Sequence, residues 1–346
     1  MGRVRNDDRM NDGDQTPTFG FPSERAETLH RVVGLDLPAY RRADIARLAG
    51  IEHERSVKWW RAMGFPEVPE DVSAFTAADI EMVRRLAALS GAGLVDDASI
   101  LRLARLLGAS FSRVAEAQVA IVEQLAATGA EREMTDAERS TALLATLNES
   151  VLDLLEDSLV YVWRRHLLAA LGRRLDADVS AGDYAVGFAD LSGFTKLSQR
   201  VSVDRLAELV DEFENIAFDA VSARGGRAVK LIGDEVMFVA DSLPVAVDIG
   251  LDIAERLGAI DDMPQIHCGI AYGPTVSVGG DVFGPTANLA ARLTTIARAG
   301  ALVIPRDAAT ELRGRDDLEL VGIRRRVDLK GIGMTRVVAV RRAAPT

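Results

Sequence analysis

The chain contains 346 residues with a net charge of -11, a hydrophobic fraction of 48% and a charged fraction of 27%. This length allows two domains with a core each, and the composition excludes a disordered protein. The acidic balance argues against broad electrostatic capture of nucleic acid or anionic lipid, because both kinds of binding need clustered Lys and Arg.

Membrane insertion and disulfide bonding are also excluded by the sequence. No stretch approaches the roughly 20 apolar residues that span a bilayer, and the polar N-terminus lacks the apolar run of a signal peptide. The single cysteine, Cys268, cannot form an intramolecular disulfide, and its apolar neighbours indicate a buried thiol. We therefore expect a soluble, cytoplasmic protein with no membrane partner.

The N-terminal part divides into a polar tail and a helical domain. Residues 1–19 are rich in Arg, Asn, Asp and Gly, so we expect a disordered tail. The pattern is helical from Pro22 to about Ala127 with short breaks at glycines, residues 130–138 are charged and loop-like, and we expect an all-helical domain over residues 20–140. An apolar stripe within this domain predicts the core face of a helix: Ile100, Leu101, Leu103, Leu106 and Leu107.

A strongly periodic segment follows and is predicted to connect two domains. Residues 135–138 have the pattern of a capping box that opens a helix. Apolar residues then recur at steps of three and four from Leu143 to Leu159, and the helical pattern continues to Leu171. We expect a continuous helical connector over residues 141–178.

Residues 179–346 alternate between strand and helix patterns. A long amphipathic helix is predicted from Phe194 to Val221, and Gly233-Asp234 between two β-rich runs indicates a tight hairpin. The order strand, helix, hairpin, helix, strand is the ferredoxin-like pattern of an α+β domain. Strands are expected at residues 184–191, 228–232, 235–240, 265–272, 302–305, 318–327 and 336–340.

Two aspartates stand where apolar strands give way to turns. Asp190 follows the first strand of this half, and Asp234 lies in the hairpin. Buried Asp is rare unless it is paired or bound to metal. Neighbouring strand ends can therefore present both carboxylates to a pair of divalent ions, and hard oxygen ligands suit Mg²⁺ or Mn²⁺. An isolated Asp-turn motif is more often a strand-end cap, so this interpretation depends on the residues around it.

The turn after Asp190 carries a second signal. It runs through Gly193, Phe194 and Thr195 into the start of a helix, where exposed amide groups form an anion site. Beside a metal-binding aspartate, such a turn predicts a cradle for a triphosphate.

These motifs resemble the class III nucleotidyl cyclases, in the family's order and at roughly its spacing, from Tyr184 to about Val340. The resemblance implies an α+β fold in which a ferredoxin-like class III cyclase catalytic domain, residues 179–346, is preceded by an all-α regulatory domain. It implies an adenylate cyclase that converts ATP into 3',5'-cyclic AMP and pyrophosphate with two Mg²⁺ or Mn²⁺ ions. By the same resemblance, the Leu191 carbonyl is a further metal ligand.

The choice of base can be predicted from hydrogen-bond polarity. Adenine offers an acceptor at N1 and a donor at its 6-amino group, whereas guanine presents the reverse. Lys230 and Asp281 supply the complementary donor and acceptor, and in guanylate-forming relatives these positions typically carry Glu and a small residue. Both positions therefore favour ATP.

The remaining catalytic roles follow from the resemblance alone. Asn288 and Arg292 are four residues apart and share one face of a predicted helix. The resemblance assigns ribose orientation to Asn288, stabilisation of the α-phosphate to Arg292 and a phosphate contact to Lys330. It also implies a head-to-tail homodimer with two equivalent sites, because this single chain carries every role.

Two interpretations compete for the N-terminal half. Segments between Tyr40 and Leu86 look similar to the winged helix-turn-helix of MerR-type regulators, although Glu52 to Glu70 is not net basic and Trp59-Trp60 suit a core. The other interpretation is a helical domain that restrains the cyclase, as in a mainly actinobacterial subgroup with some acid-responsive members. The histidines that could respond to pH are His30, His53 and His166.

A different class of function is also open. A cyclase-like domain that has lost catalysis can serve as a nucleotide sensor or a dimerisation module. Replacement of a metal-binding or transition-state residue would favour it, and the sequence shows no such replacement. The nature and the sign of the regulatory signal are not encoded in any motif.

Overall fold

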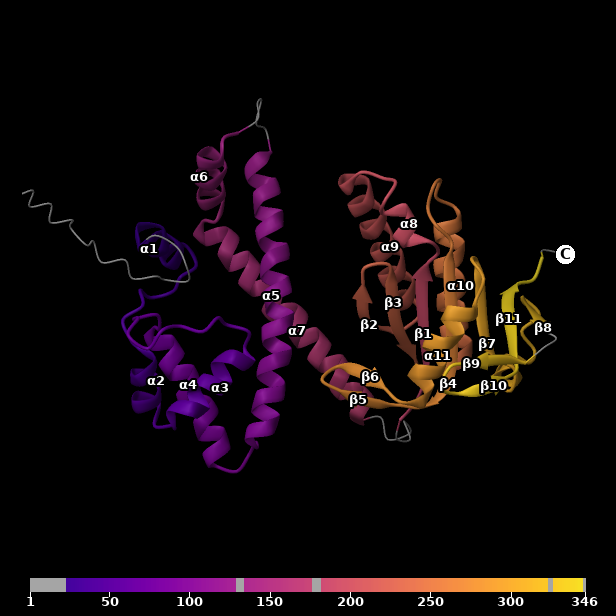
Figure 1. The fold of residues 1–346 in the computed structure, drawn as a ribbon, viewed down its shortest axis with the longest axis horizontal. Coiled ribbons are helices and arrows are strands. Elements are labelled where there is room, and N and C mark those ends of the chain that lie inside the picture. Colours follow the sequence, from indigo (N-terminus) through magenta and orange to yellow (C-terminus); the bar gives the residue numbers. More distant parts are fainter. Residues whose placement is uncertain (1–22, 129–133, 176–181, 323–325, 345–346) are drawn as a thin grey trace, which may run out of the picture. The chain divides into compact units, whose positions relative to one another are not determined.

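The computed structural model describes residues 23–128, 134–175, 182–322 and 326–344, so the predicted tail at residues 1–19 lies outside the described residues. The chain divides into two compact units, residues 1–171 and 172–346 (Figure 1). Within the described residues, no helix combines the length and the apolar character that crossing a membrane requires.

The first unit is built from helices, as predicted. Apart from an isolated β-bridge between Tyr40 and Phe75, its described elements are all helical. They are α1 (Ser23–Val32), α2 (Arg42–Ala49), α3 (His53–Ala62), α4 (Ala77–Gly91), α5 (Asp97–Ala127), α6 (Asp136–Thr146) and α7 (Glu149–Leu175).

The core of this unit is small and lies among α2, α3, α4 and the start of α5. Trp59 is 1% exposed and packs there with Trp60, as the sequence predicts, and Phe75 and Ile80 complete the centre. The predicted core stripe on α5 is wrong beyond its first turn. Ile100 is buried, but the later leucines are exposed because α5, at 31 residues, continues past the core: Leu103, Leu106 and Leu107.

The predicted continuous connector is also wrong, because the helix breaks at Leu147 and Asn148. Leu147 leaves the helical conformation, with φ -73° and ψ 63°, and Asn148 Oδ1 accepts a hydrogen bond from the Val151 amide at 3.2 Å. Asn favours this role at a helix start. The capping box that opens α6 is confirmed, since the Thr135 hydroxyl accepts from the Glu138 amide.

The helices on either side of this break have no core of their own. Neither α6 nor α7 contains a buried residue, although both carry many apolar side chains. The largest exposed apolar side chains of α7 include Leu154, Tyr161, Trp163 and Leu168.

The second unit is an α+β domain around a seven-stranded sheet, in the order β2-β3-β1-β4-β7-β11-β8. Its neighbours are antiparallel except for β4 and β7, which are parallel. The sheet strands are β1 (Asp183–Leu191), β2 (Arg227–Ile232), β3 (Glu235–Ala240), β4 (Ile266–Pro274), β7 (Ala301–Pro305), β8 (Leu318–Gly322) and β11 (Val337–Arg342). Two hairpins lie outside it, β5 (Val276–Val278) with β6 (Asp281–Phe283) and β9 (Val327–Leu329) with β10 (Gly333–Thr335).

Helices cover both faces of this sheet. One core lies between the sheet and the helices α9 (Val203–Ala223) and α10 (Leu243–Gly258), and a second lies under α11 (Pro285–Ile296). Successive side chains of a strand point to opposite faces. On β1, Ala189 faces α9 and α10, whereas Phe188 faces α11. Asp190 therefore lies on the α11 face.

Two predicted elements are interrupted. The helix predicted from Phe194 to Val221 is wrong as one element, because α8 (Phe194–Leu197) ends early and α9 begins afresh after Ser202, whose hydroxyl accepts from the Arg205 amide at 3.2 Å. The strand predicted at residues 318–327 ends at Gly322 in β8, and Val327 belongs to β9 in a separate sheet. The hairpin is confirmed, with Gly233 at φ 62° between β2 and β3.

Candidate active site

Asp190 and Asp234 come together at one end of the sheet. Asp190 is the penultimate residue of β1, and Asp234 follows Gly233 in the hairpin turn. The Leu191 amide donates to the Asp234 carbonyl oxygen at 2.9 Å, which holds the turn against the end of β1. Both side chains are partly exposed, and the Leu191 side chain is buried.

The surroundings of Asp190 disfavour its charged form. Burial, followed by the nearby Asp234, raises the pKa of Asp190 to about 6, while His267 acts in the opposite direction. A bound cation would relieve this repulsion. Divalent Mg²⁺ and Mn²⁺ suit the available donors, which are two carboxylates and the Leu191 carbonyl oxygen.

Two further groups near this pair were not identified from the sequence. Glu235 stands opposite Asp190 in the β1–β3 register, and burial and both aspartates raise its pKa. His267 stands opposite Asp190 on β4, and its Nδ1 lies 2.8 Å from the Ala297 carbonyl oxygen. Even so, no three side chains of His, Cys, Asp or Glu in the described ranges converge as a metal cluster. Backbone or external oxygen atoms would therefore complete the coordination.

Lys230 and Asp281 form the second cluster. Lys230 Nζ donates to Asp281 Oδ2 at 2.8 Å, and Asp281 Oδ1 accepts from the Val282 amide at 2.7 Å. Arg227 Nη1 also donates to the Gly280 carbonyl oxygen at 3.0 Å, which ties the β5–β6 hairpin to β2. A strand irregularity between Ala228 and Lys230 leaves Lys230 opposite Met237, on the α11 face of the sheet.

The two clusters are close in sequence but separated along β2. Lys230 precedes Asp234 by four residues. Lys230 lies on β2, whereas Asp234 lies beyond the end of β2 in the hairpin turn, and among the described residues Lys230 forms its ion pair with Asp281 and not with Asp190 or Asp234. One chain thus presents two half-sites rather than one converged set.

Asn288 and Arg292 project from the outer face of α11. Both are exposed, while the opposite face of the helix is buried against the sheet. Gly269 permits this close packing, because a Cβ there would lie 2.2 Å from the Thr294 nitrogen. Neither side chain has a hydrogen bond or an ion pair with any described residue, so both are free to contact a ligand or another chain.

The two predicted phosphate-binding elements are also exposed. Gly193 adopts φ 72° and precedes the four-residue helix α8, which begins with Phe194 and Thr195. The first amides of a helix have no partner within it. Lys330 directly follows β9, and Gly331 after it adopts φ 82°. The structure does not bring Lys330 into contact with either carboxylate cluster.

Two family models match the chain and divide it near the boundary between the units. One, described as an adenylate cyclase regulatory domain, matches residues 24–168. The other, described as an adenylate and guanylate cyclase catalytic domain, matches residues 179–340.

Relatives are similar over most of the length. An adenylate cyclase of Streptomyces coelicolor is 40% identical over 313 residues, which are 88% of this chain and 81% of the relative. An adenylate cyclase of Streptomyces griseus is 40% identical over 271 residues, which are 77% of this chain and 67% of the relative. A pH-sensitive adenylate cyclase of Mycobacterium tuberculosis is 30% identical over 318 residues, 87% of this chain and 78% of the relative.

Proposed function

This chain belongs to the class III adenylate cyclases that carry a regulatory domain before the catalytic domain, and from this we propose that it converts ATP into 3',5'-cyclic AMP and pyrophosphate. In this reaction the ribose 3'-oxygen bonds to the α-phosphorus, the bond from that phosphorus to the β-phosphate oxygen breaks, and the hydroxyl proton is released. The observation that carries the proposal is the contact between Lys230 and Asp281 at 2.8 Å.

This pair supports adenine as the base. The Lys230 ammonium would donate to adenine N1, and the Asp281 carboxylate would accept from the 6-amino group. Without a nucleotide, the ammonium of Lys230 and the carboxylate of Asp281 form an ion pair with each other. Phe283, whose ring centroid lies 6.0 Å from Lys230 Nζ, supplies an apolar neighbour for the base. Guanine would face each group with the wrong polarity, and an unmatched buried polar group costs binding free energy.

Asp190, Asp234 and the Leu191 carbonyl would hold two Mg²⁺ or Mn²⁺ ions. When bound, these ions would lower the pKa of the 3'-hydroxyl and neutralise charge on the leaving pyrophosphate. Burial, followed by the charge of Asp234, raises the pKa of Asp190, and this cost of its negative charge supports a cation between the two aspartates.

Other exposed groups of the catalytic unit would bind the rest of the nucleotide. The amides of Gly193, Phe194 and Thr195 and the ammonium of Lys330 would bind the phosphates. Asn288 would orient the ribose, and Arg292, four residues along α11, would stabilise charge that develops on the α-phosphate.

These roles require a second copy of the chain. We propose a head-to-tail homodimer in which one protomer supplies Asp190 and Asp234 while its partner supplies the residues for the base, the ribose and the transition state. The separation of the two clusters along β2 supports this arrangement. So do exposed apolar side chains within a few residues of Asp234, Asp281 and Lys330, because such surfaces are typically covered by a partner. They include Ile232, Phe283, Ile332 and Met334.

The first unit would regulate this reaction rather than bind nucleic acid. Its match to a cyclase regulatory domain and the pH-sensitive relative support this role. His166 lies exposed on α7 beside Arg164 and Arg165, so its protonation would add like charge to a helix that has no covered face. We also infer a cytoplasmic location. The buried Cys268, whose pKa burial raises to about 12, is compatible with a reducing compartment.

An inactive nucleotide sensor is the less favoured function. Every residue that the reaction needs is present, and the sensor requires at least one to be lost. Purified full-length protein with ATP and Mg²⁺ or Mn²⁺ should form cyclic AMP and pyrophosphate in equal amounts, and GTP should be a poor substrate. ATP binding without either product would favour the sensor.

A further inference from the structure

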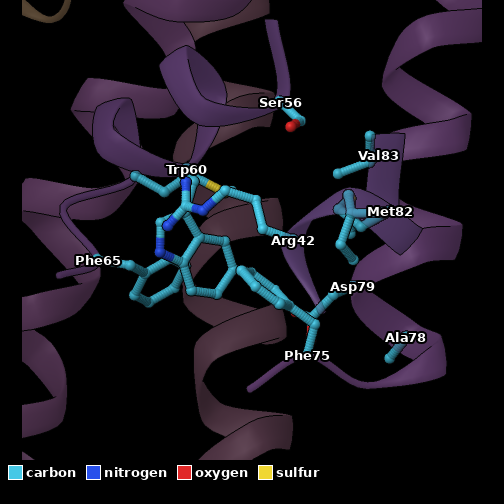
Figure 2. A pocket seen from close by; sticks show the side chains of 11 residues that line it. Arg42, Ser56, Trp60, Phe65, Phe75, Ala78, Asp79, Met82 and Val83 are labelled. Atoms are coloured by element: carbon cyan, nitrogen blue, oxygen red, sulfur yellow. The ribbon is translucent and has the colours of Figure 1, made fainter. Parts of the chain in front are cut away.

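The core of the regulatory unit contains a cavity of about 280 Å³. It lies between α2, α3 and α4 and the segments that connect them. Figure 2 shows Trp60, Phe65 and Phe75 gathered on one side and Met82 and Val83 of α4 on the other. These side chains give the cavity an apolar and largely aromatic wall.

A buried cation lies in this wall. Arg42 is only 4% exposed and lines the cavity. Arg42 Nη2 donates a long hydrogen bond to the Val68 carbonyl oxygen at 3.4 Å, and the guanidinium carbon lies 5.8 Å from the centroid of the Phe75 ring. No carboxylate among the described residues forms an ion pair with it.

The acidic residue that shares the cavity does not neutralise Arg42. Asp79 Oδ2 accepts hydrogen bonds from the Thr76 amide at 2.7 Å and from the Thr76 hydroxyl at 2.9 Å, as part of the capping box of α4. Buried charges are costly unless they are paired. The cavity therefore presents a guanidinium that has no carboxylate partner among the described residues, and its natural partner is a planar carboxylate that accepts two hydrogen bonds.

We propose that this cavity is a binding site for a small aromatic carboxylate, with its ring system among Trp60, Phe65 and Phe75 and its carboxylate on Arg42. The size fits this class, since a cavity of about 150 Å³ accommodates benzene and this one is about 280 Å³. A bicyclic ring with one carboxylate fills such a space. The site lies wholly within the regulatory unit and does not depend on the proposed reaction.

Isothermal titration calorimetry of the full-length chain with 2-naphthoate tests the proposal. We expect saturable binding with a Kd below about 1 mM. The uncharged 2-naphthamide should bind at least tenfold more weakly because it cannot pair with Arg42, and octanoate should bind at least tenfold more weakly because it has no ring. Absence of naphthoate binding, or equal affinity for all three compounds, would overturn the proposal.

A pair of variants tests the location without removing the buried arginine. Ala78 lines the cavity and is exposed, so Ala78→Phe should fill part of the space and weaken naphthoate binding at least tenfold. Ala77 is its exposed neighbour and does not line the cavity, so Ala77→Phe is the matched control and should leave the affinity unchanged. Equal affinities in the two variants would place the ligand elsewhere and refute the site.

Discussion

The two units of the chain use apolar helices in opposite ways. In the catalytic unit, α9, α10 and α11 bury one face each against the sheet. In the regulatory unit, α6 and α7 contain no buried residue despite their apolar composition. The catalytic unit is thus a rigid frame that holds its functional groups at fixed strand and helix ends. The regulatory helices leave apolar surface uncovered, and an element that packs differently in two states is what a device that changes state requires.

The largest expected effect is the loss of activity when Asp190 or Asp234 of the catalytic unit is replaced. Asp190→Ala or Asp234→Ala would remove one of the proposed metal ligands, so cyclic AMP formation should fall by at least about 10²-fold. Asp261 is exposed and has no hydrogen bond or ion pair with any described residue, so Asp261→Ala is the matched control and should keep full activity. Activity and thermal unfolding of the three proteins are the measurements. A folded Asp234→Ala protein with near-normal turnover would remove the metal assignment.

The second effect concerns base selection. In a protein carrying Lys230→Glu and Asp281→Cys, neither substituted side chain can form the hydrogen bond that adenine requires. Each lost hydrogen bond should cost about 1 to 3 kcal/mol of transition-state binding. The value of kcat/KM for ATP should fall accordingly, while the dependence of the rate on metal concentration stays the same. If the steady-state kinetics with ATP are unchanged, these residues do not contact the base.

The third effect concerns the uncovered helices. His166→Ala should change the pH profile of the full-length enzyme several-fold between pH 5 and 8, where His titrates. A truncated chain that starts at Val179 should lose the pH response altogether. His53→Ala is the comparison variant, because His53 lies on α3 and pairs with Glu70 at 3.8 Å. Identical profiles for all four proteins, or specific retention of DNA in a gel-shift assay, would contradict regulation through α7.

The smallest effect is one of stability. Asp190 has a raised pKa of about 6 in the folded protein, against 3.8 ordinarily, so its charge disfavours folding at pH values above 6. Asp190→Asn should therefore raise the melting temperature of the metal-free protein at pH 8 by about a few degrees. As the pH falls below 6, the folded wild type binds a proton and its disadvantage shrinks; it is gone only below 3.8, where the unfolded chain is protonated too, so the gain from Asp190→Asn should be smaller at pH 5 than at pH 8. Calorimetry at pH 8 and pH 5 with a chelator measures this, and a variant that is less stable at pH 8 would speak against charge repulsion at the site.

Local chemistry explains which parts of the fold were predictable. The hairpin at Gly233 and the capping box at Thr135 depend on a few adjacent residues, and both are confirmed. The breaks at Asn148 and Ser202 were missed, because each polar residue is a modest interruption of a strong apolar period. The exposure of Leu103 was missed for another reason, since periodicity shows which face is apolar and not whether anything covers it.

The residues of the candidate site also differ in how well the sequence predicts their positions. Asp190 and Asp234 stand at strand ends that the sequence marks clearly. The contact of Lys230 with Asp281, in contrast, joins residues 51 positions apart and requires the β5–β6 hairpin to lie on β2. Glu235 was overlooked because only the register of β1 with β3 shows that it faces Asp190.

The central claim is that each active site combines two copies of the chain, and subunit complementation tests it most directly. An Asp190→Ala chain and an Arg292→Ala chain should each be inactive alone. Mixed in equal amounts under conditions that allow exchange, half of the dimers carry one intact site, so activity should return to about a quarter of the wild-type value. Differently tagged chains show by co-purification that mixed dimers have formed. Mixed dimers that remain as inactive as either variant alone would contradict the account.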